Sequence, residues 1–330
     1  MAGSGSSLLD LLEVQVGTES NFGTAVTPTA KLMGVQNFAL DPGIKAKAFH
    51  DRRGSMAPAY LTALTGIEPA APLELLATYE DIDFILDNLC GQATPSGSGT
   101  YTRNYAAPIG SVPSPRLLTW VYGDGTNCYK LTSGLISKCT FKGENGAPMM
   151  VTADLIGALV DGGTKASLSD RSVSLVMGDH LVPYIDAWGG TIGTTALSAA
   201  SWSYELTIDA KRKLDAYFGN LAPQSYHEDD GANGWDVMLK LKLEFNAANK
   251  AQYDALISTS AVYQKQVRLK STSGSKVLQF DIAGTSEESP RFGDDRGGVL
   301  AFETTLKGTY NTALGNYFKA QSINAVSSLP

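Results

Sequence analysis

The chain has 330 residues, of which 43% are hydrophobic and 18% are charged, and its formal net charge is −7. This length and composition exclude a disordered chain and allow two domains of about 150 residues, each with its own core. The acidic balance argues against a protein that neutralises nucleic-acid phosphates over a broad surface, because that needs clustered Lys and Arg.

The cysteines and the first residues suggest where the protein is made. Cys90, Cys128 and Cys139 form an odd set without CxxC spacing, so we expect reduced thiols in a protein made in the cytoplasm. The N-terminal residues lack a basic segment followed by an apolar core, and no stretch approaches the ~20 apolar residues of a membrane span. We therefore expect a soluble protein without a signal peptide.

The first half begins with an expected arm, residues 1–12, followed by a strand that starts at Leu12–Val16. Alternation in Leu73–Tyr79 predicts a strand with one buried face. A short helix follows, and the carboxylates of Glu80–Asp83 suit its first turn. The apolar stripe expected on this helix consists of Ile82, Ile85, Leu86 and Leu89.

The first half continues with a long segment, Gln92–Pro115, which is rich in Gly, Ser and Pro and is predicted to be a loop. Three further strands are expected, the first at Arg116–Tyr122 and the last at Met149–Leu155. The segment Gly123–Asn127 has the composition of a hairpin turn after the first of them. Gly157 closes this group of strands.

The second half repeats this order with its own residues. Trp235–Phe245 is the clearest strand, because apolar and polar side chains alternate over eleven positions, with Met238 as the exception. Asn246 is a plausible N-cap of a second helix. Strands are expected at Gln266–Lys270 and Leu300–Leu306, the latter before Gly308.

The two halves also match in sequence. Phe38–Lys47 reappears as Tyr204–Lys213, an offset of 166 (204 minus 38), and the same offset without a gap relates Leu73 to Leu239 and Leu75 to Leu241. We predict a mainly β protein with two tandem antiparallel β-sandwich or half-barrel domains, residues 1–163 and 164–330, each with a short α-helix. A duplicated β-unit halves the number of chains needed to close a ring.

Several segments resemble the tail tube (major tail) proteins of long-tailed, non-contractile bacteriophages. The resemblance covers most of the chain, and its motifs occur in a consistent order. They are Gln15–Thr29 with Lys31-Leu32, Gly54–Tyr60, Ala77–Asp81, Tyr101–Ala106, Leu243–Asn246 and Tyr310–Asn316.

The resemblance implies a virion protein without enzymatic activity or cofactor, assembled in the cytoplasm of the bacterial host. Copies would join edge to edge into stacked rings whose inner sheets form one continuous barrel around a channel for DNA. A duplicated member would form trimeric, pseudo-hexameric rings. Its partners would be further copies of itself and the tape measure, tail terminator and tail tip proteins. Double-stranded DNA would pass through without specific binding.

We expect the contacts between chains and between rings to come from the Lys45–Gly66 loop, the Gln92–Pro115 loop and the termini. For the basic residues we favour pairing with acids such as Asp41, Asp209 and Asp215 over contact with phosphate. The loop tip around His50 is interpreted equally as a salt-bridging contact or as a solvated tip. The candidate contact residues are Lys45, Lys47, His50, Arg52, Arg53, Tyr60, Tyr101, Arg103, Tyr105, Lys211, Lys213 and Tyr226.

Other classes of function are weaker alternatives. Gly97–Gly99 and Gly123–Gly125 lack the context of a phosphate-binding loop, and His227–Asp230 offers one His beside acids in a loop, so neither a nucleotide nor a metal is expected. No G-x-S-x-G elbow accompanies the three histidines. A carbohydrate-binding or receptor-binding β-sandwich would use Trp120, Trp188 or Trp202 as sugar platforms. A tube from a secretion machine or contractile injection machine is a third alternative, which the duplication disfavours.

Overall fold

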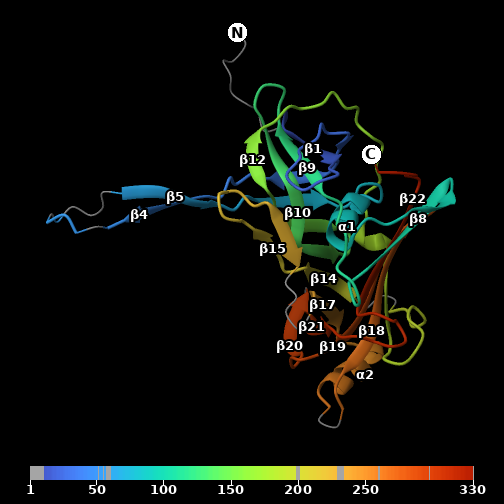
Figure 1. Ribbon diagram of the computed structural model, residues 1–330. Helices are drawn as coiled ribbons and strands as arrows, with labels where there is room; N and C mark the ends of the chain where they lie inside the picture. Colours follow the sequence, from blue (N-terminus) through green and yellow to red (C-terminus); the bar gives the residue numbers. More distant parts are fainter. Residues whose placement is uncertain are drawn as a thin grey trace.

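The computed structural model describes residues 11–50, 52–54, 56, 61–197, 201–228, 234–258, 261–296 and 298–329, with the backbone alone for residue 248 and residues 291–296. The expectation of a mainly β protein is confirmed, because the described part is built of antiparallel strands with two short α-helices (Figure 1). Neither helix is both long and apolar enough to cross a bilayer, and this holds for the described residues.

We call the elements from β1 to β12 the first half. They are β1 (Glu13–Thr18), β2 (Ala30–Lys31), β3 (Val35–Phe38), β4 (Ile44–Phe49), β5 (Leu61–Ile67), β6 (Ala70–Leu76), α1 (Ile82–Cys90), β7 (Ser96–Ser98), β8 (Thr100–Ala106), β9 (Leu118–Gly123), β10 (Cys128–Glu144), β11 (Met150–Ile156) and β12 (Leu159–Gly162).

The second half begins with a single 3-10 turn, η2 (Gly178–His180). Its other elements are β13 (Leu181–Ala187), β14 (Ser201–Asp209), β15 (Arg212–Asp215), β16 (Ser225–Glu228), β17 (Asp236–Glu244), α2 (Ala247–Leu256), β18 (Gln264–Ser273), β19 (Lys276–Thr285), β20 (Arg291–Arg296), β21 (Val299–Gly308) and β22 (Phe318–Asn324).

The same strand order occurs in both halves. In the first half the ladders run β1–β9–β10–β11–β6–β3, and β12 pairs with the start of β10. In the second half they run β13–β18–β19–β21–β17–β14, and β22 takes the place of β12 beside β19. Each helix follows the corresponding strand, β6 or β17. The chain therefore contains one topology twice.

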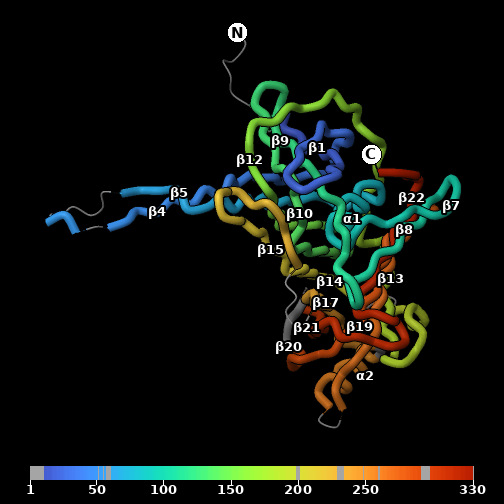
Figure 2. The backbone as a smooth tube through the Cα atoms, viewed as in Figure 1, coloured from blue at the N-terminus to red at the C-terminus, as the bar shows by residue number. Residues whose placement is uncertain are grey.

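A single β-sheet continues through both halves. The end of β10 pairs with β14, so an inner sheet of order β20–β21–β17–β14–β10–β11–β6–β3 runs through the whole chain. Behind it, Phe141 of β10 and Phe280 of β19 lie 4.8 Å apart between ring centroids in a shared core. Figure 2 shows the two halves stacked along the length of the molecule.

Long strand β10 belongs to two sheets because it bends in its middle. Its first part pairs with β9 and its second part with β11, and both ladders are irregular around Leu131–Lys138. Ser133 has φ of 52° at the bend, and buried Glu19 accepts a 2.8 Å hydrogen bond from its backbone N–H. In the second half the equivalent of this long strand is divided in two, because residues 286–290 separate β19 from β20.

Most expected elements are confirmed, but the ungapped offset of 166 is wrong. Phe38 lies opposite Leu73, whereas Tyr204 lies opposite Leu241 rather than Leu239. The second half is therefore shifted by two residues in this ladder. A two-residue shift keeps every side chain on the same face of the sheet, so the alternating pattern alone could not reveal it.

Two further expectations are corrected. Segment Gln92–Pro115 is not a loop throughout, because it contains β7 and β8, and β8 pairs with the C-terminal strand β22 from Lys319↔Ala106 to Asn324↔Tyr101. The apolar stripe expected on α1 does not separate a buried face from an exposed one, because all nine residues of the helix are buried. Asn246, by contrast, is a cap as expected, and its Oδ1 accepts a 3.1 Å bond from the Asn249 N–H.

Candidate assembly surfaces

The junction between the halves is a regular antiparallel ladder. Seven residue pairs, from Lys138↔Asp209 to Glu144↔Ser203, join the second part of β10 to β14. Leu206 and Phe141 are paired within it and both are fully buried, so the ladder also closes the core. This sequence can therefore join two copies of its β-unit edge to edge.

The inner sheet ends in two strands whose outer edges have no ladder partner among the described residues. These are β3, which pairs with β6 alone, and β20, which pairs with β21 alone. Topology makes β3 the equivalent of β14, and β20 the equivalent of the second part of β10. The two open edges thus correspond to the two strands that meet at the internal junction.

The solvent face of the inner sheet is covered by charged side chains on alternate positions. Glu205 lies at its centre, 3.0 Å from Lys142 and 3.9 Å from Lys240. Among the described side chains of this face, acids outnumber bases by eight to five. They are Glu74, Glu144, Asp154, Glu205, Asp209, Asp236, Glu244 and Glu303 against Lys138, Lys142, Lys240, Lys242 and Lys307.

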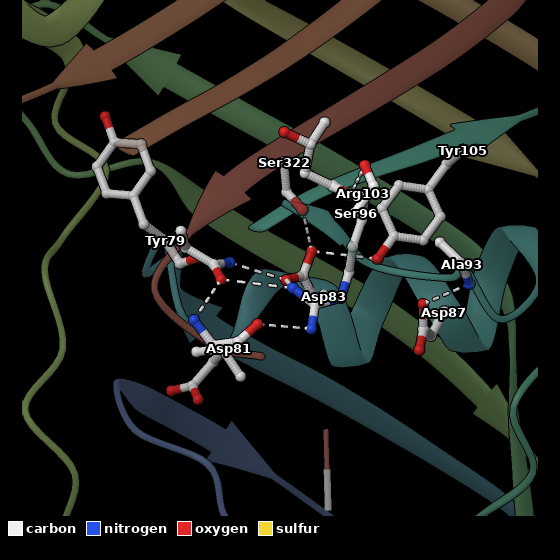
Figure 3. Close-up of polar contacts among 12 residues, drawn as sticks. Tyr79, Asp81, Asp83, Asp87, Ala93, Ser96, Arg103, Tyr105 and Ser322 are labelled. Carbon is white, nitrogen blue, oxygen red and sulfur yellow. Dashed lines mark hydrogen bonds and ion pairs between the residues drawn. The ribbon is translucent and has the colours of Figure 1, made fainter. Parts of the chain in front are cut away.

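A buried polar cluster around Asp83 of α1 ties the C-terminal strand to the first half (Figure 3). The Asp83 carboxylate is fully buried and accepts bonds from Arg103 Nη1 at 3.0 Å and from Tyr105 Oη at 3.1 Å. From β22, Ser322 Oγ and Asn324 Nδ2 also donate to it, the latter at 2.8 Å. These donors compensate the burial of the carboxylate, which would otherwise be costly.

Two other acids of the α1 region are buried in the same way. Asp87 accepts a 2.9 Å bond from Arg116 Nε, and Asp81 at the helix start is paired with Arg171. Burial raises the pKa of both carboxyls, and the arginines oppose that rise. The sequence does place three carboxylates in and just before this mostly apolar helix, and they could have indicated buried ion pairs. Their pattern was interpreted only as a favourable first turn of the helix.

Arg212 of β15, one of the basic residues expected to pair with acids at an interface between chains, is buried inside the chain. Its guanidinium is buried, donates to the carbonyls of Asn88 and Leu89 at 2.8 and 2.6 Å, and pairs with Glu228 at 3.0 Å. A cation at the carbonyl end of a helix is favourable because those carbonyls lack helical partners. The second half therefore caps the helix of the first half.

Five of the candidate contact residues lie on a hairpin, β4–β5, that projects far from the body in Figure 1. Every residue of β4 is exposed, as are residues 52–54 at the tip. Lys45 is paired with Glu68 rather than with Asp41, and Lys47 lies 5.7 Å from the Phe49 ring. The five residues are Lys45, Lys47, His50, Arg52 and Arg53, and Tyr60 lies outside the described residues.

Two other candidates are corrected because they lie inside the chain. Arg103 is 1% exposed and Tyr105 is 4% exposed, and both bind Asp83, so their side chains offer no surface to a neighbouring chain. Tyr101, in the same strand, is half-buried and pairs with Asn324 across the β8–β22 ladder. The Gly-rich surroundings of these residues suggested a loop, whereas the structure places them in a strand.

The remaining candidates surround the shorter hairpin β15–β16. The Lys211 ammonium pairs with Asp236 at 3.2 Å rather than with Asp209 or Asp215, and Lys213 is exposed. Tyr226 is half-buried with its ring centroid 5.9 Å from that of Phe22. Lys45 and Lys211 thus pair within one chain, with acids other than those expected.

The residues of the other chemical alternatives differ in burial, and Trp188 and Trp202 are half-buried. His227 Nδ1 lies 2.9 Å from Asp215, and no group of three metal-binding side chains occurs in the described residues, which do not include 229 and 230. Trp120 is fully buried, so it cannot be a sugar platform. Cys90 and Cys139 are buried free thiols, and burial raises the pKa of Cys90 to about 12.

No protein-family model matches this chain, and no curated protein shows significant sequence similarity to it.

Proposed function

We propose that the protein is a structural building block that assembles edge to edge into rings, and that the rings stack into the tail tube of a long-tailed phage. The observation that carries this proposal is the ladder between β10 and β14, because it joins the two copies of one topology inside a single chain. A contact that works between the halves of one chain is available between chains as well.

The two open edges supply the strands for that contact. If β3 of one chain pairs with β20 of the next, as β14 pairs with β10, each junction in the ring repeats the internal one. Closure removes every open edge of the inner sheet, and open edges otherwise promote uncontrolled association. Three chains with eight inner strands each would give a barrel of 24 strands (three times eight), in line with the trimeric ring that the resemblance implies.

The charged face of the inner sheet suits the wall of a DNA channel. Its described acids outnumber its bases, and a ring of three chains would carry a formal charge of three times −7, or −21. Such a wall repels phosphates instead of holding them, so DNA would slide without specific binding. The tape measure, tail terminator and tail tip proteins are the partners that this role requires, and the virion is its location.

A proline at Leu40 tests the edge contact. Ala39 and Asp41 donate their N–H groups to Pro72 and Ala70 of the first half, at 3.3 and 2.8 Å, so the intervening N–H of Leu40 points to the open edge. Leu40→Pro removes this donor, whereas Leu40→Ala keeps it and removes the side chain.

The expected result is that wild type and Leu40→Ala form rings or tubes and Leu40→Pro stays monomeric. Light scattering after size exclusion, with negative-stain microscopy, gives the readout, and circular dichroism checks that both variants are folded. Rings of folded Leu40→Pro with the same yield as Leu40→Ala would rule out pairing through β3.

A further inference from the structure

The contact between hairpin β15–β16 and helix α1 provides a template for a second contact between chains. Arg212, the first residue of β15, donates to carbonyls at the C-terminal end of α1 and to Ile136 O of β10 at 2.8 Å. The hairpin of the second half thus lies across the helix end of the first half. A neighbouring chain in a ring would present its own first-half hairpin to α2 in the same way.

A shared turn shows which residues of hairpin β4–β5 correspond to those of β15–β16. Asp41 Oδ1 accepts from the Gly43 N–H, and Asp209 Oδ1 accepts from the Lys211 N–H, both at 2.8 Å. Gly43 and Lys211 both have positive φ, 59° and 54°. The next residue in each hairpin is therefore equivalent, which places Ile44 where Arg212 lies in the second half.

The hairpin β4–β5 has one apolar face and one mixed face. The apolar face contains Ile44 and Leu64, with 64% and 53% of their surface exposed, together with the small residues Ala46 and Ala48. Lys45 and Lys47 lie on the opposite face. A projecting hairpin with exposed aliphatic side chains along one face has the features of a docking element.

Helix α2 has a matching apolar surface at its C-terminal end. Ile257, directly after the helix, is 53% exposed, and Val262, before β18, is 67% exposed. The corresponding end of α1 is covered by Arg212 and is buried throughout. Among the described residues, the end of α2 is thus the uncovered member of an equivalent pair.

We infer that the apolar face of hairpin β4–β5 packs against the C-terminal end of α2 in the adjacent copy of this chain, with Ile44 beside Ile257 and Val262. An apolar contact replaces the guanidinium–carbonyl contact of the internal junction. This inference rests on the proposed ring, because the same neighbour that pairs β3 with β20 brings its hairpin to α2.

Cross-linking between two chains, each with one engineered accessible cysteine, tests this contact. Both chains carry Cys128→Ser, since Cys128 is the half-buried native thiol while Cys90 and Cys139 are buried. One chain carries Ile44→Cys and the other Ile257→Cys; they are mixed, assembled and treated with a short bismaleimide. Covalent dimers on a denaturing gel are expected only in the mixture, at least about tenfold above the yield for either chain alone.

The matched control replaces Ile44→Cys by Lys45→Cys, one position along the strand and on the opposite face, and should give few dimers. Rings by negative stain without Ile44–Ile257 dimers, or equal yields for both positions, would overturn the inference and leave the edge pairing intact. Failure of the wild-type chain to form any ring would instead contradict the proposed function.

Hydrogen exchange on the wild-type chain covers the case in which the cysteine variants do not assemble. Amides at the end of α2 and in β4–β5 should gain protection on ring formation. Unchanged exchange in either segment would count against the contact.

Discussion

The two helices of this protein occupy equivalent places in a repeated topology, yet their surroundings differ. Helix α1 lies at the junction between the halves, and all nine of its residues are buried. Helix α2 lies at the far end of the second half in Figure 1 and exposes Lys250, Ala251 and Asp254. In the proposed ring, the exposed polar side chains of α2 would keep the chain soluble before assembly, and the apolar contact would be confined to Ile257 and Val262 near the end of the helix.

The largest difference in stability is expected between substitutions of the carboxylates of the two helices. Asp83→Ala should lower the free energy of unfolding by about 3–5 kcal/mol, because Arg103 would be left buried without its anion. Helix α2 carries its carboxylate near its other end, at Asp254, which pairs at the surface with Lys250, and Asp254→Ala should cost about 0.5 kcal/mol or less. Denaturant unfolding measures both, and equal losses would refute the contrast between the helices.

A smaller effect is expected where the second half caps the first. Arg212→Ala removes three hydrogen bonds to carbonyls and should destabilise the chain by about 2–3 kcal/mol, since buried carbonyls and Glu228 lose their partner. The adjacent exposed change Lys213→Ala should stay within about 0.5 kcal/mol. If Arg212→Ala lowered the free energy of unfolding no more than Lys213→Ala does, the contact of Arg212 with α1 could not serve as the template for the contact with α2.

The smallest effect concerns a turn of the second half and depends on pH. Burial disfavours the charge of Asp186, but hydrogen bonds from Thr194, Gly193 and Thr195 outweigh it and lower its pKa. A carboxyl with a lowered folded pKa contributes stability above its unfolded pKa of about 3.9, and this contribution disappears as pH falls through the folded value. Asp186→Asn should therefore be less stable than wild type at pH 6 and closer to it near pH 2. A pH-independent difference in melting temperature would contradict this assignment.

The strands could be predicted from the sequence because alternation is a local signal. In β17, Val237, Leu239, Leu241 and Leu243 are buried as expected, and Met238 is exposed. The N-cap at Asn246 could be predicted for the same reason, because capping depends on residues that are neighbours in the sequence. The two-residue shift between the repeats was invisible because it preserves the alternation.

The candidate site was predicted less well, since it depends on contacts between distant segments. The burial of Arg103 requires strand β22 to reach the first half, and the cap on α1 requires a hairpin 122 positions away (212 minus 90) to return to it. Neither follows from local periodicity. The segment Lys45–Gly66, expected to be a loop, contains most of the exposed hairpin β4–β5, which carries five of the twelve candidate residues.

The most direct test of edge-to-edge assembly is a cryo-electron microscopy map of purified assemblies. We expect rings of three chains in which β3 of each chain is hydrogen-bonded to β20 of the next, with the charged face of the inner sheet toward the channel. A map in which both of these strands face solvent, or in which the chains meet through their outer sheets, would contradict it.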